Sequence, residues 1–399
     1  MKQTLFIGEY SSRNVGDGII RMAIEKLCFQ HGLPAAFRDF YGGTPGAGPA
    51  AAGTADARSA GTAARPPSFL QKARAALLRV ELVNYAIALL FYFTRYRSIA
   101  AGYDVQRYQQ VVIGGGNLLM DNFLNFPLLI LRIVQQCERH RVPVKLFSVG
   151  AGKRYSWLGR QIMARIIQSD AVECVVCRDG NTYSLIKEIG EEESGHKIIC
   201  SFDSGLYLER GDAPTGRTET VGLGVIAPSV LKMVTPEHPM ADPSYAMRWW
   251  DALVGELAAK IGADHIEIFS NGSEVDNDFA RDLWQALSPK YPGLSVCTSI
   301  RSPADLILRV GGYKALAAYR MHAAVTAMAL DVPVVGFEWD PKVLQMFTYC
   351  GKRKACVALE EFPKRPAREL IASMLDETPA RLEPIRRVLD RDFRHATNA

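Results

Sequence analysis

The chain lacks the long uninterrupted apolar run that a membrane-spanning helix needs. Its most apolar stretch, residues 77–93, is short for a bilayer span and contains Arg79 and Glu81. The apolar start of the chain is followed at once by Gly8 and Glu9, which is unlike a secretory signal. We therefore expect neither a transmembrane helix nor a secretory leader.

Strong charge and paired cysteines are also missing. The 399 residues carry a net charge of only +5, and basic residues are interleaved with acidic ones, so nucleic acid is not an expected partner. The eight cysteines are scattered. Cys174 and Cys177 form a CxxC within a strand-like run, where residues three apart face opposite sides, so a zinc or redox site is not expected. Free thiols indicate a reducing compartment, and we expect a cytoplasmic protein.

The length and the alternation of elements predict two α/β domains. Residues 211–219 are polar, with Gly and Pro, and are typical of a linker. The expected domains are 1–210 and 217–399. Residues 44–68 are dominated by Ala, Gly and Pro, a composition that cannot bury enough surface to become ordered, so a mobile insert is predicted there.

An apolar helix is predicted over residues 70–97, and it carries several Lys and Arg side chains. The favoured interpretation is a helix packed in the core or at a dimer interface. The alternative is an interfacial helix at the inner face of the membrane, because Tyr, Phe and basic flanks suit that position.

Two strand ends in the N-terminal half are rich in glycine. Residues 111–117, VVIGGGN, predict a buried strand ending in Gly114–Gly116, with Asn117 and Asp121 beyond. This is not a dinucleotide fingerprint. The strand at 142–149 runs into glycines followed by Lys153 and Arg154, where amides and cations together suit an anion; solvated loop charges are the alternative.

The first strand leads into a helix through Asn14, Gly16 and Asp17. Residues of this kind at a first βα turn place caps and backbone amides near the helix start, a geometry suited to a polar ligand. Asp17 is alternatively an N-cap and no more.

The most informative stretch is residues 314–347. A small apolar strand at 315–318 delivers Arg320 and His322 to the start of a helix, and a second strand ends at Glu338 and Lys342. Ligands of open α/β sheets lie outside the carboxyl ends of the strands, so these side chains are candidates for a site. A structural ion pair for the arginine and a satisfied polar group for the histidine are the alternatives.

Taken together, these motifs resemble those of the polysaccharide pyruvyl transferase family. The matching features are Asn-x-Gly-Asp at the first helix, Gly-Gly-Gly followed by Asp, an Arg after the strand at 174–177, and Arg-x-His-Ala-Ala followed by Val-Pro-Val-Val and a Lys. One element departs: Asp203-Ser204-Gly205 stands where the family has Asp-Pro-Ala. The resemblance implies two doubly wound Rossmann-like domains in a glycosyltransferase-B-like arrangement, with the last helix packing back on the first domain.

The resemblance also implies transfer of the pyruvyl group of phosphoenolpyruvate to a sugar of a polysaccharide or oligosaccharide precursor, such as an exopolysaccharide unit, as a ketal. Phosphoenolpyruvate is then a co-substrate, and no metal or redox cofactor is required. The residue roles that we assign on this basis are catalytic for His322 and Arg320, donor-binding for Lys342, Arg178, Lys153 and Glu338, and acceptor-binding or cleft-forming for Asn14, Gly16, Asp17, Gly114, Gly115, Gly116, Asn117 and Asp121.

Two other functions stay open at this point. A glycosyltransferase using a nucleotide sugar shares the fold. It would need a carboxylate in the C-terminal half to recognise the ribose of the nucleotide, and Glu338 is the candidate. A non-catalytic polysaccharide-assembly protein is the second. The acceptor is expected to be lipid-linked if the helix at 70–97 contacts a membrane, and a homo-oligomer is compatible with that helix.

Overall fold

The computed structural model describes residues 3–10, 15–41, 81–121, 124–152, 155–190, 197–213, 216–362 and 367–398, with side chains except those of 81–86. The predicted insert at 44–68 lies outside these ranges. The chain forms two compact units: unit 1 comprises Met1–Ser11, Leu27–Phe202 and Arg391–Ala399, and unit 2 comprises Ser12–Lys26 and Asp203–Asp390. These division points differ from the linker expected at 211–219.

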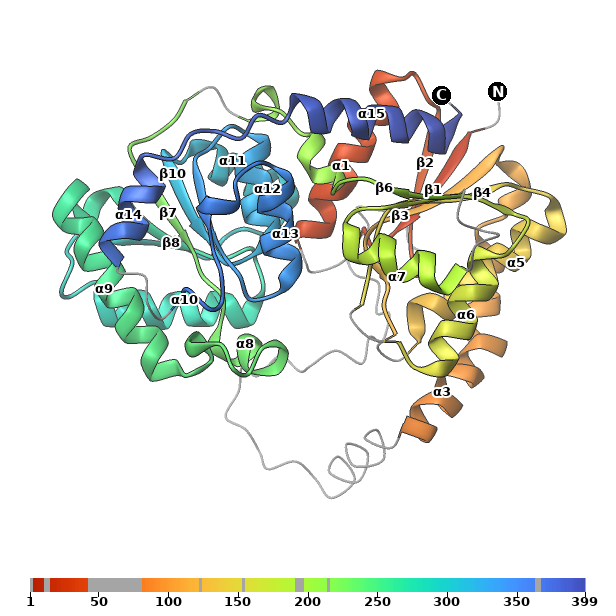
Figure 1. The fold of residues 1–399 in the computed structure, drawn as a ribbon, viewed down its shortest axis with the longest axis horizontal. Coiled ribbons are helices and arrows are strands. Elements are labelled where there is room, and N and C mark those ends of the chain that lie inside the picture. The colour runs from red at the N-terminus through yellow and green to blue at the C-terminus, as the bar shows by residue number, and fades with distance from the viewer. Residues whose placement is uncertain are drawn as a thin grey trace. The chain divides into compact units, whose positions relative to one another are not determined.

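Unit 1 is built on a six-stranded parallel sheet of apolar strands (Figure 1). Its order is β2 (Ala35–Asp39), β1 (Thr4–Gly8), β3 (Gln110–Leu119), β4 (Val144–Ala151), β5 (Val172–Cys177) and β6 (Ile198–Cys200). The order reverses between β1 and β3, which pair in parallel from Thr4 opposite Gln110. In sheets of this type that reversal marks the edge where ligands bind.

Strand β3 does not stop at the glycines, contrary to the sequence prediction. It continues to Leu119, with a register shift after Gly116. Gly115 and Gly116 have φ angles of 80° and 104°, which only glycine adopts freely. A Cβ at Gly114 would overlap the carbonyl oxygen of Phe147 on the neighbouring strand, so this glycine permits close strand packing.

The apolar helix predicted at 70–97 is, in the described part, two helices. α3 (Glu81–Phe93) and α4 (Arg95–Gly102) are separated at Thr94, whose hydroxyl donates to the Leu90 carbonyl oxygen at 2.7 Å. Such a bond to the preceding turn favours a bend. Tyr96 and Tyr103 are buried in the unit 1 core, whereas Leu90 and Phe93 are 60% and 64% exposed.

The other helices of unit 1 alternate with the strands. They are α5 (Asn125–His140), α6 (Trp157–Ile167) and α7 (Gly180–Gly190). The last helix is α15 (Glu383–Thr397), and its residues 391–397 also belong to unit 1. There Phe393 stacks on Phe6 with ring centroids 6.3 Å apart. Gln110 donates to the Thr397 carbonyl oxygen at 2.6 Å. No helix in the described ranges is long and apolar enough to cross a bilayer.

Unit 2 has a second six-stranded parallel sheet with its own core. Its order is β12 (Cys356–Val357), β11 (Val334–Phe337), β10 (Ala315–Ala318), β7 (Val221–Gly224), β8 (Ile266–Phe269) and β9 (Ser295–Cys297). The order reverses between β7 and β10. The predicted strand before Arg320 therefore lies at the switch point of this sheet.

The helices of unit 2 begin with recognisable signals. Asp242 caps α9, Ser302 and Asp305 form a capping box on α11, and Asp340 caps α13; each of these helices has proline in its first turn. The helices are α8 (Pro228–Val234), α9 (Pro243–Ile261), α10 (Glu274–Leu287), α11 (Pro303–Gly312), α12 (Met321–Ala329), α13 (Pro341–Tyr349) and α14 (Ala367–Leu375), together with the first turns of α1 (Val15–Gln30).

Candidate functional site

Arg320 lies immediately before α12, two residues beyond the end of β10. Its Nε and Nη2 atoms donate to Oδ2 of Asp276 at 2.8 and 2.6 Å. Asp276 is fully buried, whereas 24% of the Arg320 side chain is exposed. The guanidinium is thus anchored on one edge and open on another.

Asp276 also serves a second loop. It lies in the first turn of α10, and its Oδ1 atom accepts a hydrogen bond from the backbone N–H of Ala227 at 2.8 Å. Ala227 precedes α8, just beyond β7. One carboxylate therefore joins the loops that follow β7 and β10, the two strands that flank the switch point.

Trp339 lies beside Arg320 and follows the neighbouring strand β11. Its indole Nε1–H donates to the Tyr319 carbonyl oxygen at 2.7 Å. The Arg320 guanidinium carbon and the Lys342 ammonium lie 5.8 and 5.7 Å from the Trp339 ring centroid, within cation–π range. Arg320 and Lys342, two of the predicted site residues, are thus gathered around one aromatic ring.

His322 is the second residue of α12 and packs against the first turn of α1. A Cβ atom built on Gly16 would lie 2.5 Å from Cγ and 2.9 Å from Cβ of the histidine, and closer still to Nδ1. Only glycine leaves room for the imidazole here. Sequence order grouped Gly16 and Asp17 with the acceptor residues, but the structure places both in unit 2 with His322.

The other ring nitrogen of His322 faces a carboxylate. Nε2 lies 3.7 Å from Oδ2 of Asp203, is buried, and makes no hydrogen bond within the described residues. Asp203 follows β6, and its Oδ1 accepts the N–H of Gly205 at 2.9 Å, which caps the short helix η3 (Ser204–Tyr207). The Asp203 carboxylate is thus the acid nearest to this ring nitrogen among the ion pairs of the described residues.

Two predicted residues, Arg178 and Asn117, meet inside unit 1. Arg178, beyond β5, donates from Nη2 to Oδ1 of Asn117 on β3 at 2.5 Å, and its Nε lies 3.9 Å from Asp179. A Cβ at Gly150, on β4, would lie 2.5 Å from the same Nε. Only 3% of the Arg178 side chain is exposed. Its guanidinium therefore ties strand ends together.

Asp121 has a structural task in unit 1. Its Oδ2 accepts the backbone N–H of Ser156, the N-cap of α6, and its Cγ would lie 2.6 Å from a Cβ at Gly159. In unit 2, Glu338 is similarly engaged, because it accepts the backbone N–H of Leu359 at 3.0 Å. Asn14 and Lys153 lie outside the described residues.

Sequence reasoning missed three members of the unit 2 site: Asp203, Asp276 and Trp339. Asp203 had a signal, since it follows a predicted strand directly. Asp276 had none, because an acid in the first turn of a helix is ordinarily explained by the helix dipole. Its ion-pair partner, Arg320, is 44 residues away in the chain.

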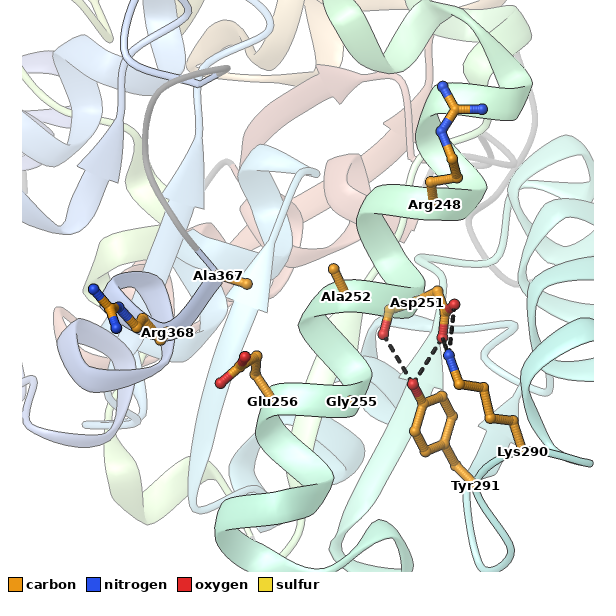
Figure 2. Close-up of a pocket in the computed structure, with 9 residues that line it drawn as sticks. All are labelled: Arg248, Asp251, Ala252, Gly255, Glu256, Lys290, Tyr291, Ala367 and Arg368. Atoms are coloured by element: carbon orange, nitrogen blue, oxygen red, sulfur yellow. Dashed lines mark hydrogen bonds and ion pairs between the residues drawn. The ribbon is translucent and has the colours of Figure 1, made fainter.

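A cavity of roughly 460 Å³ lies elsewhere in unit 2, along α9 (Figure 2). Two of its charges pair with each other: Lys290 donates to both oxygens of Asp251 at 2.8 Å, and Tyr291 donates to Asp251 at 2.7 Å. The hydrogen bond from Lys290 lowers the pKa of Asp251. Arg248 and Arg368 point away from this network (Figure 2). None of the predicted site residues lines this cavity.

Comparison with known proteins bears on the fold and on the family of the chain. No curated protein sequence matches the chain. Two similar solved structures are the UDP-forming α,α-trehalose-phosphate synthase of Burkholderia vietnamiensis, at 8% identity, and the UDP-GlcNAc 2-epimerase of Methanocaldococcus jannaschii, at 11%. Each has a TM-score of 0.52, and each match covers 100% of this chain. The matches cover 96% of the synthase chain and 100% of the epimerase chain.

These similarities confirm the fold class, an α/β chain of two doubly wound Rossmann-like domains of the glycosyltransferase-B-like type. At such low identity they show the fold alone. The family model described as polysaccharide pyruvyl transferase matches residues 14–341, most of the chain and every residue of the unit 2 site except Lys342. The chain therefore belongs to the polysaccharide pyruvyl transferase family.

Proposed function

We propose that this protein transfers the pyruvyl group of phosphoenolpyruvate to a sugar of a polysaccharide or oligosaccharide precursor and forms a ketal. The observation that carries the proposal is the pairing of Arg320 and His322 at the switch point, each beside its own carboxylate, in a chain of this family. It is a proposal for a cytoplasmic enzyme with phosphoenolpyruvate as co-substrate.

The donor carries a phosphate and a carboxylate, so its site needs several cations and amides. Arg320 and Lys342 supply the charge, one on each of two neighbouring strand ends. The N-termini of α12 and α13 begin at the same two loops, and their backbone N–H groups favour anions. We assign phosphate and carboxylate binding to this group.

The chemistry requires proton transfer at several points. Protonation of C3 of the enol leaves positive charge at C2, a sugar hydroxyl adds to C2 and loses its proton, and phosphate leaves with the electrons of the C2–O bond. A second hydroxyl then adds to C2, loses its proton and closes the ketal. Two protons are taken up, at C3 and by the phosphate, and the two hydroxyls release two, so the steps balance without a metal or redox cofactor.

His322 is the group we assign to these proton transfers, since an imidazole changes charge near neutral pH. The Asp203 carboxylate lies 3.7 Å from Nε2 of this histidine. For the acceptor, the proposal retains the backbone of Gly114–Gly116 and the side chain of Asn117, which belong to β3 in unit 1. A lipid-linked acceptor is part of the proposal, because α3 presents exposed apolar side chains.

Calorimetric titration with phosphoenolpyruvate, and separately with a panel of nucleotide sugars, tests the donor. We expect saturable binding of phosphoenolpyruvate that weakens in Arg320→Lys. The lysine variant is preferred to alanine, because removal of the arginine charge would leave the buried Asp276 unpaired at a cost of about 3–5 kcal/mol. Binding of a nucleotide sugar in place of phosphoenolpyruvate would refute the proposal and indicate a glycosyltransferase.

A further inference from the structure

The contacts of Arg320 divide its guanidinium into two edges. An arginine has five N–H donors in a rigid plane. Two of them, on Nε and Nη2, are taken by Asp276 Oδ2. The ring of Trp339 lies at 5.8 Å and limits the tilt of the plane. The remaining donors lie along the edge away from Asp276, on a side chain that is 24% exposed.

The support beneath this arginine is itself rigid. Asp276 is fully buried, and both of its oxygens are engaged, one with Arg320 and one with the N–H of Ala227. It belongs to α10, which follows β8, while its partners follow β10 and β7. The carboxylate therefore cannot turn without breaking a bond to one of two other loops.

We infer that Asp276 is a positioning residue of the donor site, which holds Arg320 so that its outer edge presents paired N–H groups to an anionic group of the donor. The inference rests on the proposed function. A buried ion pair is weak evidence for stability, because desolvation offsets its Coulombic gain. A pair with one member fully buried and the other partly open is instead suited to orienting the open member.

The consequence is a defect in donor affinity specific to one substrate. In Asp276→Asn, whichever way the amide is turned, one of the two N–H partners faces an NH₂ group, so the arginine loses its fixed edge. We expect the KM for phosphoenolpyruvate to rise about 10-fold to 100-fold, the size of one hydrogen bond to a charged group. The KM for the acceptor and kcat should stay within about twofold of wild type, because contacts that a substitution does not touch usually change by no more than about 0.5 kcal/mol.

The matched control is Asp305→Asn. Asp305 is another acid in the first turn of a unit 2 helix, where it accepts the backbone N–H groups of Arg301 and Ser302 at 2.9 Å. Loss of this capping box should lower Tm without changing the KM for phosphoenolpyruvate. A purely structural role for Asp276 would give the same pattern in Asp276→Asn, with lower Tm and unchanged KM, and that result would overturn the inference.

Arg320→Lys provides a second route that does not depend on the folding of the asparagine variant. A lysine keeps the charge and can pair with Asp276, but it has no second edge. We expect a KM for phosphoenolpyruvate raised as much as in Asp276→Asn, and no further rise in the double variant, because both changes remove the same interaction. A wild-type KM in Arg320→Lys, or additive effects in the double variant, would overturn the inference.

Failure of the underlying function has a different signature. If the wild-type protein does not bind phosphoenolpyruvate, the proposed function fails before Asp276 is tested. A readout independent of turnover is the Arg320 Nε–H resonance in ¹⁵N-arginine-labelled protein, assigned by its loss in Arg320→Lys. We expect this resonance to be protected from exchange in wild type and not in Asp276→Asn; an unprotected resonance in wild type would contradict a fixed guanidinium.

Discussion

Replacing Gly16 by alanine tests the proposed role of His322 from outside the catalytic side chains. The new Cβ would lie 2.5 Å from Cγ and 2.9 Å from Cβ of the histidine. Carbon atoms pack at about 3.5–4.0 Å, so the imidazole or the first turn of α1 has to move by about 1 Å. The atoms that the new Cβ would meet include Cβ and Cγ of the histidine, near its backbone, so a small turn of the ring alone does not relieve the overlap.

The size of the effect follows from the displacement. A catalytic group misplaced by about 1 Å costs about 100-fold in rate, which corresponds to about 2.7 kcal/mol in the activation free energy. Helix propensity acts in the opposite direction, since alanine favours a helix over glycine by about 0.5–1 kcal/mol. A loss of rate in Gly16→Ala therefore does not arise from a weaker helix.

The assay is phosphate release from phosphoenolpyruvate with an acceptor, together with Tm. Gly312→Ala is the control, because Gly312 is also helical and a Cβ there would meet nothing within 4 Å. We expect the control to keep wild-type activity. If Gly16→Ala folds and retains activity within a few-fold of wild type, the position of His322 against α1 is unimportant for turnover and its assignment to proton transfer is refuted.

Three further predictions concern other parts of the chain. His322→Ala should abolish phosphate release while leaving Tm near wild type; retention of most activity would remove His322 from the mechanism. Burial lowers the pKa of His238 to about 4, so the folded protein binds fewer protons than the unfolded chain between pH 6.5 and 4, and acidification through this window lowers the free energy of unfolding. The loss from pH 7 to pH 5 should be about 2 kcal/mol and should shrink in His238→Asn; equal pH slopes for the two proteins would contradict it. The exposed face of α3 should bind anionic vesicles, and sedimentation with them should fall in Leu90→Glu and Phe93→Glu but not in Phe29→Glu, a change at another exposed aromatic; a wild-type protein indifferent to lipid would exclude this surface.

Much of the fold was predictable because its elements carry local signals. The strand before Arg320 and the helix after it consist largely of small apolar residues, and the next strand contains β-branched residues and follows a proline. These patterns predict the type of each element from the sequence alone. The two-residue strand β12 has too few residues to show a pattern. The continuation of β3 through Gly114–Gly116 depends on pairing with β4, a tertiary contact that overrides local preference. The break at Thr94 depends on one local side-chain bond, which the apolar pattern of this stretch does not reveal.

The candidate site was predictable only in part, for a related reason. Arg320 and His322 could be identified because each follows a recognisable strand end. The carboxylates beside them, Asp276 and Asp203, come from distant segments, and nothing in their own neighbourhoods predicts which cation they meet. The internal contacts of Arg178 and Asp121 within unit 1 could not be predicted from the sequence either, because their partners Asn117 and Ser156 lie on other elements.

The packing of Gly16 on His322 has a practical consequence for dissecting this chain. The wall beside the histidine is supplied by a turn about 300 residues earlier in the sequence, within Ser12–Lys26. A C-terminal fragment that begins at Asp203 would contain the whole second sheet, Arg320 and Asp276. It would lack Gly16, so one face of the His322 imidazole would be exposed to solvent. Study of unit 2 on its own thus requires Ser12–Lys26 to be restored, by co-expression or by fusion to the fragment.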